Sequence, residues 1–248
     1  MQTILIVFVS SLIATFLSVM SGGGASTITL PVFLWTGMSL PLAIAVHKVC
    51  AIFWTPISAY NYLKDRKINW GFLLVFAAIG LVGAYLGVQF VLKIDESVVR
   101  PAIGVIILTL VAYTYFKKDL GIKEKKVNSK IKKILAYPTA IIMGFYESVF
   151  GAGNGIVFTA VTFHSRGFDF INALGYYFAV AFFWASFASV LYIQKGYFDL
   201  GIMSAAILGS TIGSYAGSKY AKLKGNKFIK TIFIIIGGLL GVKLILGF

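Results

Sequence analysis

Two charged residues, Lys48 and Glu147, stand within long apolar stretches of this sequence. A charge in such surroundings is costly, so by default it indicates a functional site. Lys48 could attract an anion, and Glu147 could carry a proton if burial favours its neutral form. His47, beside Lys48, is a second candidate for a proton carrier. Alternatively, Lys48 and Glu147 pair with each other or extend to a membrane interface.

Two glycine-rich segments, 21–27 and 151–155, could form an anion site. Three neighbouring glycines break a helix, and each segment precedes a short apolar run (26–36 and 156–163) that predicts a new helix. The first N–H groups of a helix lack internal partners and attract anions. Ser26, Thr27 and Asn154 could cap these helices or contact the ligand. Including Lys48, the predicted substrate-binding residues are Gly22, Gly23, Gly24, Ser26, Thr27, Lys48, Gly151, Gly153, Asn154 and Gly155.

The composition predicts an all-α membrane protein. The chain is 59% hydrophobic and only 12% charged, whereas soluble domains are about a quarter charged. Runs of about 20 apolar residues, enough to cross a bilayer, follow one another from Ile4 onwards. The net charge of +14 falls in short strips between these runs, which indicates membrane topology and not nucleic-acid binding. Cys50 is the only cysteine, which excludes an internal disulfide, and we expect no cofactor and no metal site.

The chain is internally duplicated. Shifted by 130 residues, the segment 4–87 aligns with the second half without a gap and pairs Trp54 with Trp184 and Tyr62 with Tyr192. We therefore predict repeat 1 at 1–116, a basic linker at 117–133 and repeat 2 at 134–248. The tyrosines end their spans and suit the membrane interface, whereas the tryptophans lie deeper and either pack or form a pocket wall. The paired glycines Gly83, Gly87, Gly213 and Gly217 are typical of close helix crossings.

Each repeat contains one glycine-broken segment and three further helices, expected at 41–63, 71–92 and 98–116, and at 169–192, 200–218 and 228–247. The broken segment must fold back, as a re-entrant or double-pass element, because the basic strips 64–67, 117–133 and 219–230 then all face the cytoplasm. The two repeats would thus be inverted, as in many secondary transporters. We expect a multi-pass protein of the cell membrane with both termini outside the cytoplasm.

These motifs resemble the TauE/SafE family of sulfite exporter-like permeases. The first copy runs from Ser21 through Pro31, Gly37 and Ala43 to Lys48, and the second spans 144–155 with an acid at Glu147. The resemblance implies a prokaryotic permease for sulfite, organosulfonates or related anions. Family members often carry an acid in the first repeat too, where this chain has Leu17.

The predicted function is secondary transport of a small, sulfur-containing anion, coupled to protons through Glu147 or His47. The expected partners are this anion and the lipid bilayer, with no nucleic acid. The alternatives are an intramembrane enzyme and a non-transporting membrane scaffold. An enzyme would need a nucleophile with a paired base, and the spans contain no Ser/His or paired-Asp arrangement, so we predict no enzymatic activity. The exact substrate, the direction of transport, the coupling ion and the oligomeric state are left open.

Overall fold

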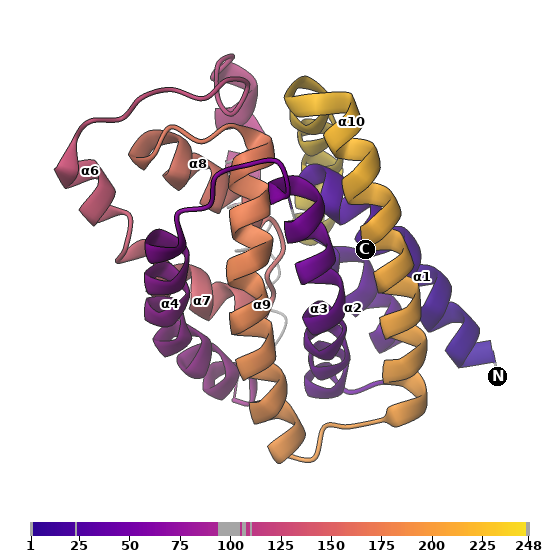
Figure 1. Ribbon diagram of the computed structural model, residues 1–248. Coiled ribbons are helices and arrows are strands. Elements are labelled where there is room, and N and C mark those ends of the chain that lie inside the picture. The colour runs from indigo at the N-terminus through magenta and orange to yellow at the C-terminus, as the bar shows by residue number, and fades with distance from the viewer. Residues whose placement is uncertain (1, 23, 94–104, 106–107, 110, 247–248) are drawn as a thin grey trace.

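The structure, a computed structural model, describes residues 2–22, 24–93, 105, 108–109 and 111–246. Within these ranges every element of regular secondary structure is an α-helix (Figure 1). In this part of the chain, five helices are long and apolar enough to cross a membrane. They are α1 (Gln2–Ser21), α3 (Leu40–Leu63), α4 (Trp70–Val91), α9 (Phe170–Gln194) and α10 (Leu200–Leu246), of which Leu200–Ile232 forms the qualifying span. The predicted all-α membrane class is confirmed.

Four shorter helices surround the glycine breaks and the linker. They are α2 (Ser26–Trp35), α6 (Lys130–Leu135), α7 (Thr139–Val149) and α8 (Asn154–Ser165). An 11-residue helix such as α7 is about 16 Å long, roughly half of a hydrocarbon core of about 30 Å. α7 and α8 therefore each reach only part of the way across. The predicted span 98–116 lies largely outside the described residues, of which 111–116 are helical.

The long helix α10 bends at Gly225, where φ is +80°. L-amino acids rarely adopt this left-handed conformation, and glycine does so without steric cost. The bend divides α10 into two straight parts, which explains why the sequence predicts two spans, 200–218 and 228–247, in this region. The lysines of the strip 219–230 lie on both sides of the bend.

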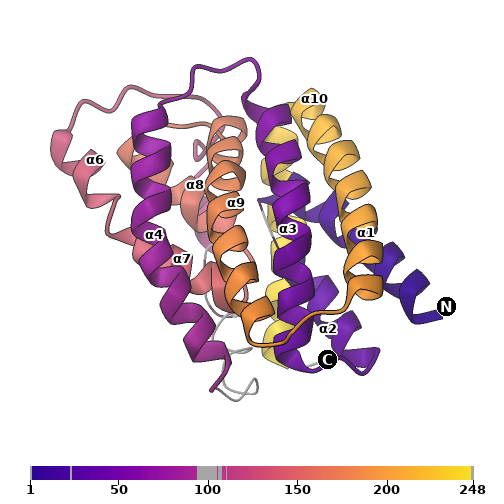
Figure 2. The ribbon, with the colours of Figure 1, turned by 60° about the horizontal axis from the view of Figure 1, so that its bottom comes forward.

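Glycines let helices of the two halves cross at close range. α1 packs against α10, α7 against α4, and α3 lies beside α9 (Figures 1 and 2). A Cβ atom on Gly83 would lie 1.8 Å from the carbonyl oxygen of Ile141, and one on Gly213 would lie 2.3 Å from that of Leu12. No side chain fits at these distances, so the prediction of close crossings at these glycines is confirmed.

Tyr62 and Tyr192 pack inside the protein and do not face lipid headgroups, so their interpretation as an exposed aromatic belt is wrong. Both are fully buried. Tyr62 donates a hydrogen bond to the Val19 carbonyl at 2.8 Å, and Tyr192 donates one to the Ser148 carbonyl at 3.3 Å. These carbonyls belong to the last turns of α1 and α7, where helix carbonyls have no internal partner. The two tyrosines therefore supply hydrogen-bond donors to free carbonyls at the C-terminal ends of α1 and α7, directly before the glycine breaks.

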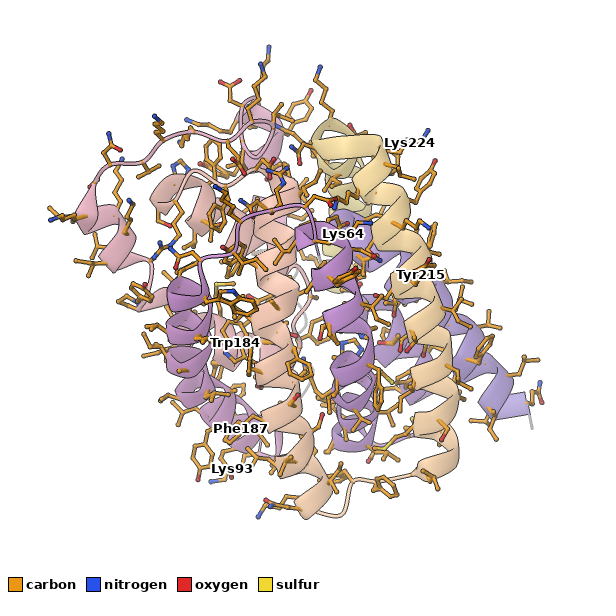
Figure 3. All side chains as sticks on the ribbon, viewed as in Figure 1. Lys64, Lys93, Trp184, Phe187, Tyr215 and Lys224 are labelled. Atoms are coloured by element: carbon orange, nitrogen blue, oxygen red, sulfur yellow. The ribbon has the colours of Figure 1, made fainter. Side chains whose placement is uncertain are left out.

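Basic side chains gather at one end of the helix bundle. Lys64 and Lys224 lie toward this end and Lys93 toward the opposite one (Figure 3). The linker is held at the basic end, because Arg66 forms ion pairs with Glu124 of the linker at 2.7 Å and with Asp169, just before α9, at 2.9 Å. Burial lowers the pKa of Lys125 in the same linker.

Candidate functional site

Lys48 of α3 and Glu147 of α7 form a buried ion pair. Their side chains are only 1% and 8% exposed, and Lys48 Nζ lies 3.1 Å from Glu147 Oε1. The same ammonium group also donates to the main-chain carbonyl of Glu147. Of the alternatives that the sequence left open, mutual pairing is the one observed. Such a pair keeps both residues charged in the apolar interior only if further hydrogen bonds satisfy the remaining oxygen.

Two neutral donors supply those hydrogen bonds. Asn154 Nδ2, at the start of α8, lies 2.9 Å from Glu147 Oε2, and the Tyr177 hydroxyl of α9 lies 2.8 Å from the same oxygen. Asn154 Nδ2 also donates to the Met143 carbonyl at 3.0 Å. The carboxylate therefore accepts from an ammonium, an amide and a phenol group that reach it from three different helices.

The second glycine break positions this carboxylate. Gly151 and Gly153 have φ angles of +72° and +73°, in the left-handed region that favours glycine. A Cβ atom on Gly151 would lie 2.8 Å from Glu147 Oε1. Larger residues would thus oppose both the chain reversal and the position of Glu147. Gly153 is the N-cap of α8, which corrects the interpretation of Asn154 as a cap, since Asn154 is the first helical residue and its side chain binds Glu147.

The two glycine breaks meet in the interior. A Cβ atom on Gly155 would lie 2.2 Å from the carbonyl oxygen of Gly22, so the two backbones touch. Gly22 and Gly24 also have positive φ angles, of +90° and +123°. Gly23 lies outside the described residues. The two breaks therefore approach each other at Gly22 and Gly155.

The polar residues after the first break turn back onto their own backbone. Ala25 is the N-cap of α2, without a side-chain cap bond, so the cap interpretation of Ser26 and Thr27 is wrong. Thr27 donates its hydroxyl hydrogen to the Gly24 carbonyl, and Ser26 is buried. The Gly24 carbonyl also accepts the main-chain N–H of Thr27 at 3.0 Å, so the hydroxyl adds a second hydrogen bond within the same turn. As ligand contacts, both residues stay predictions.

His47 and the two tryptophans lie apart from the Glu147 carboxylate contacts. His47 Nδ1 is 3.1 Å from the Thr29 hydroxyl of α2. Trp184 is fully buried and donates its indole N–H to the Ala77 carbonyl of α4 at 2.8 Å. Trp54 packs edge-on against Phe178, with ring centroids 5.5 Å apart. Packing thus accounts for what the structure describes of the tryptophans, and a pocket wall at these positions stays a prediction.

Sequence reasoning missed Tyr177 and Thr29. Tyr177 stands in an apolar helix with no charge or glycine motif beside it, so local pattern gave no reason to select it. One signal was available, because Tyr177 follows His47 by 130 residues and is its equivalent in the second repeat. His47 of α3 contacts α2 and Tyr177 of α9 contacts α7, so these aligned positions both face a helix beside a glycine break.

The cluster provides the hydrogen-bond donors of an anion site, and the Glu147 carboxylate takes the position of the anion. The ammonium group of Lys48, the amide of Asn154 and the hydroxyl of Tyr177 could equally donate to the oxygens of a small oxyanion. Among the residues that the structure describes, Asn154 Oδ1 is a buried acceptor without a hydrogen-bond partner. That oxygen could accept a hydrogen bond from a protonated group that enters the site.

Removing only the cation of this pair should destabilise the protein strongly. We expect Lys48→Met to lower the free energy of unfolding by about 3–5 kcal/mol, because Glu147 is then left buried without its charge partner. The Lys48→Met/Glu147→Gln double variant should recover a substantial part of this loss. Thermal unfolding in detergent measures both, with Lys195→Met, at an exposed position, as the matched control. Equal stability of Lys48→Met and Lys195→Met would show that the pair contributes nothing.

Known proteins resemble this chain over almost its entire length. Residues 7–244 match the family described as Sulfite exporter TauE/SafE. A probable membrane transporter protein of Haemophilus influenzae is 26% identical, with 97% of this chain and 93% of that protein covered. The probable membrane transporter protein YfcA of Escherichia coli is 23% identical (97% and 88% covered), and YdhB of Bacillus subtilis, with the same description, is 20% identical (97% and 99% covered).

No solved structure matches the chain significantly. The family and the descriptions of the relatives indicate a membrane transporter and not an enzyme. Because the match covers nearly every residue, both glycine breaks and the Lys48–Glu147 pair fall within it. The chain therefore belongs to the TauE/SafE family of membrane transporters.

Proposed function

We propose that this protein is a secondary transporter that binds a small oxyanion between Lys48, Asn154 and Tyr177, at the place now held by the Glu147 carboxylate. The convergence of these three donors on one buried carboxylate carries the proposal. A negative charge inside the membrane domain needs this kind of environment, whether it belongs to the protein or to a substrate. Membership of a transporter family supports movement of the anion over simple binding.

Protons are coupled to transport through Glu147. An ionised Glu147 neutralises Lys48 and excludes a second anion from the site by charge repulsion. A proton on Glu147 removes that negative charge and leaves Lys48 as an unpaired cation, which then favours binding of the substrate anion. The proton and the anion therefore enter together, and the total charge of the occupied site stays unchanged. His47, bonded to Thr29, is the second candidate for the proton carrier.

The substrate is a sulfur oxyanion, such as sulfite or an organosulfonate. The family description supports this class. Its chemistry also suits the site, because sulfite and sulfonate groups present several oxygens on one small centre. These oxygens can accept hydrogen bonds from the ammonium, amide and phenol donors at the same time.

The transporter consists of two inverted repeats in the cell membrane, with both termini outside the cytoplasm. Equivalent helices α3 and α9 lie side by side and run in opposite directions (Figures 1 and 2). The helix before each glycine break also packs against a helix of the other half, since α1 contacts α10 and its counterpart α7 contacts α4. These observations support an axis in the membrane plane, with the two broken segments near the membrane centre.

Transport in liposomes tests the proposed role of Glu147. An inward proton gradient should drive accumulation of labelled sulfite or sulfoacetate by the wild-type protein. Glu147→Gln should lose this accumulation but keep exchange of anion between the two sides at equilibrium, because its site no longer depends on a proton. The measurement is uptake of label with and without a gradient, corrected with protein-free liposomes.

Asp119→Asn serves as the matched control, because it removes a carboxylate from an exposed position in the linker. This variant should accumulate the anion as the wild type does. Full gradient-driven accumulation by Glu147→Gln would contradict coupling through this residue. A wild-type protein that transports neither sulfite nor sulfoacetate would contradict the proposed function itself.

Thiol labelling tests the topology. With Cys50 replaced by Ser, single cysteines are introduced as Lys126→Cys in the linker, Lys224→Cys beside the bend of α10, and Lys195→Cys at the opposite end. An impermeant thiol reagent should label only Lys195→Cys in intact cells, and all three variants after the membrane is opened. A cysteine added after Phe248 should behave as Lys195→Cys does. Labelling of Lys224→Cys in intact cells would contradict the inverted arrangement.

A further inference from the structure

Two cavities of opposite character meet at the basic end of α3. One, of about 470 Å³, is lined mostly by apolar side chains of α3, α4 and α9, including Leu63, Trp70 and Phe183. The other, of about 510 Å³, lies between α3 and α10 and is lined mostly by polar and charged side chains, together with Leu223. Tyr60 and Lys64 line both cavities. The surface around the last turn of α3 is therefore an apolar groove joined to a basic pocket.

The basic pocket carries a net positive charge. Among the described residues, Lys64, Lys219 and Lys222 line it with Asp65 as the single acidic residue, so three positive charges face one negative charge. Lys222 pairs with Asp65 at 2.8 Å, and its hydrogen bond lowers the pKa of that carboxyl. Lys219 stands over the ring of Tyr215, 5.4 Å from its centroid. Lys64 of α3 and Tyr215 of α10 both line this pocket, and Figure 3 shows Lys64 nearer the basic end.

The apolar groove opens toward the surroundings of the helix bundle. The aromatic side chains of Tyr60 and Trp70 are 68% and 60% exposed at its edge. Trp and Tyr in such positions are typical of the level where lipid headgroups begin. Arg66 also lines the groove, but it forms ion pairs with Glu124 and Asp169. Lys64, in contrast, lines both the groove and the pocket.

We propose that the joined cavities bind one anionic phospholipid, with an acyl chain in the apolar groove and the phosphate group against Lys64, Lys219 and Lys222. Basic pockets between membrane helices suit lipid headgroups, and the surface of the cytoplasmic leaflet is negative. A free phosphate ion would explain only the basic pocket. The adjoining groove needs an apolar occupant linked to the anion, and a phospholipid combines both in one molecule.

Fluorescence quenching of Trp70 tests this site, because Trp70 lines the groove. The protein is placed in mixed vesicles in which either phosphatidylglycerol or phosphatidylcholine carries brominated acyl chains, which quench nearby tryptophans. The Trp70 signal is the difference between the wild type and Trp70→Phe. We expect the brominated phosphatidylglycerol to be preferred at Trp70 by at least about fivefold, the factor that one lysine supplies near an anionic phosphate.

The triple variant Lys64→Gln/Lys219→Gln/Lys222→Gln should lose this preference. The matched control Lys130→Gln/Lys132→Gln/Lys133→Gln removes three lysines from α6 and should keep it. Trp35, the last residue of α2, is 78% exposed and does not line the groove. The difference in quenching between the wild type and Trp35→Phe therefore measures any general enrichment of the anionic lipid around the protein. Equal quenching of Trp70 by both lipids, or an unchanged preference in the Lys64 triple variant, would overturn the proposal. Loss of the preference on addition of inorganic phosphate would instead assign the pocket to a free anion.

Discussion

The buried pair of Lys48 and Glu147 is the constraint on which the arrangement of the central helices depends. Placing two charges in an apolar interior is unfavourable unless nearly every donor and acceptor is satisfied. Here α3 brings the ammonium group, α7 the carboxylate, α8 the amide of Asn154 and α9 the hydroxyl of Tyr177. The glycine break between α7 and α8 is part of the same requirement, because a side chain at Gly151 would occupy the space of the carboxylate.

Some features recur in both halves of the chain at the 130-residue shift that predicts the repeats, whereas the charged cluster occurs once among the described residues. The tyrosines that satisfy the broken helices, and the glycines at the helix crossings, occur in both halves. The charged cluster does not, since the repeat partners of Glu147, Asn154 and Lys48 are Leu17, Gly24 and Phe178. The contact between α3 and α10 contains hydrogen bonds between polar side chains that the aligned, described positions lack. Ser58 forms a hydrogen bond with Ser214, and Asn61 donates one to Ser218. The positions 130 residues away are apolar, namely Ala188 with Ala84 and Leu191 with Val88. A proton or anion route through the membrane domain would therefore use one half of the duplication more than the other.

Much of this fold could be predicted from the sequence, because its determinants are local. Apolar runs of sufficient length give the membrane helices, and clustered glycines give the breaks between α1 and α2 and between α7 and α8. The match between Trp54 and Trp184 at a shift of 130 residues predicts the duplication. Most of the described helix ends were predicted to within a few residues for the same reason. However, α8 begins two residues before the expected Ile156, and the first part of α10 continues past the expected end at 218 to the bend at Gly225.

The contacts of the site could not be predicted in this way, because they join residues far apart in the chain. Lys48 and Glu147 are separated by 99 positions, so the sequence identified both as unusual but left open whether they meet. Tyr177 carries no local mark of function, and only its hydrogen bond to Glu147 gives it a role. Tyr62 and Tyr192 were misassigned because span-end tyrosines usually face the interface, and here the unsatisfied carbonyls at the ends of α1 and α7 bind them inside.

The central claim is that Glu147 occupies the place of the transported anion. Calorimetric titration of wild type and Glu147→Gln in detergent, with an organosulfonate whose charge is constant over the pH range used, tests it most directly. If the carboxylate competes with the substrate, Glu147→Gln should bind the anion at neutral pH about tenfold more tightly than the wild type. Binding by the wild type should strengthen as the pH falls, whereas binding by the variant should change little. Equal affinities at neutral pH, or loss of binding in Glu147→Gln, would contradict the account.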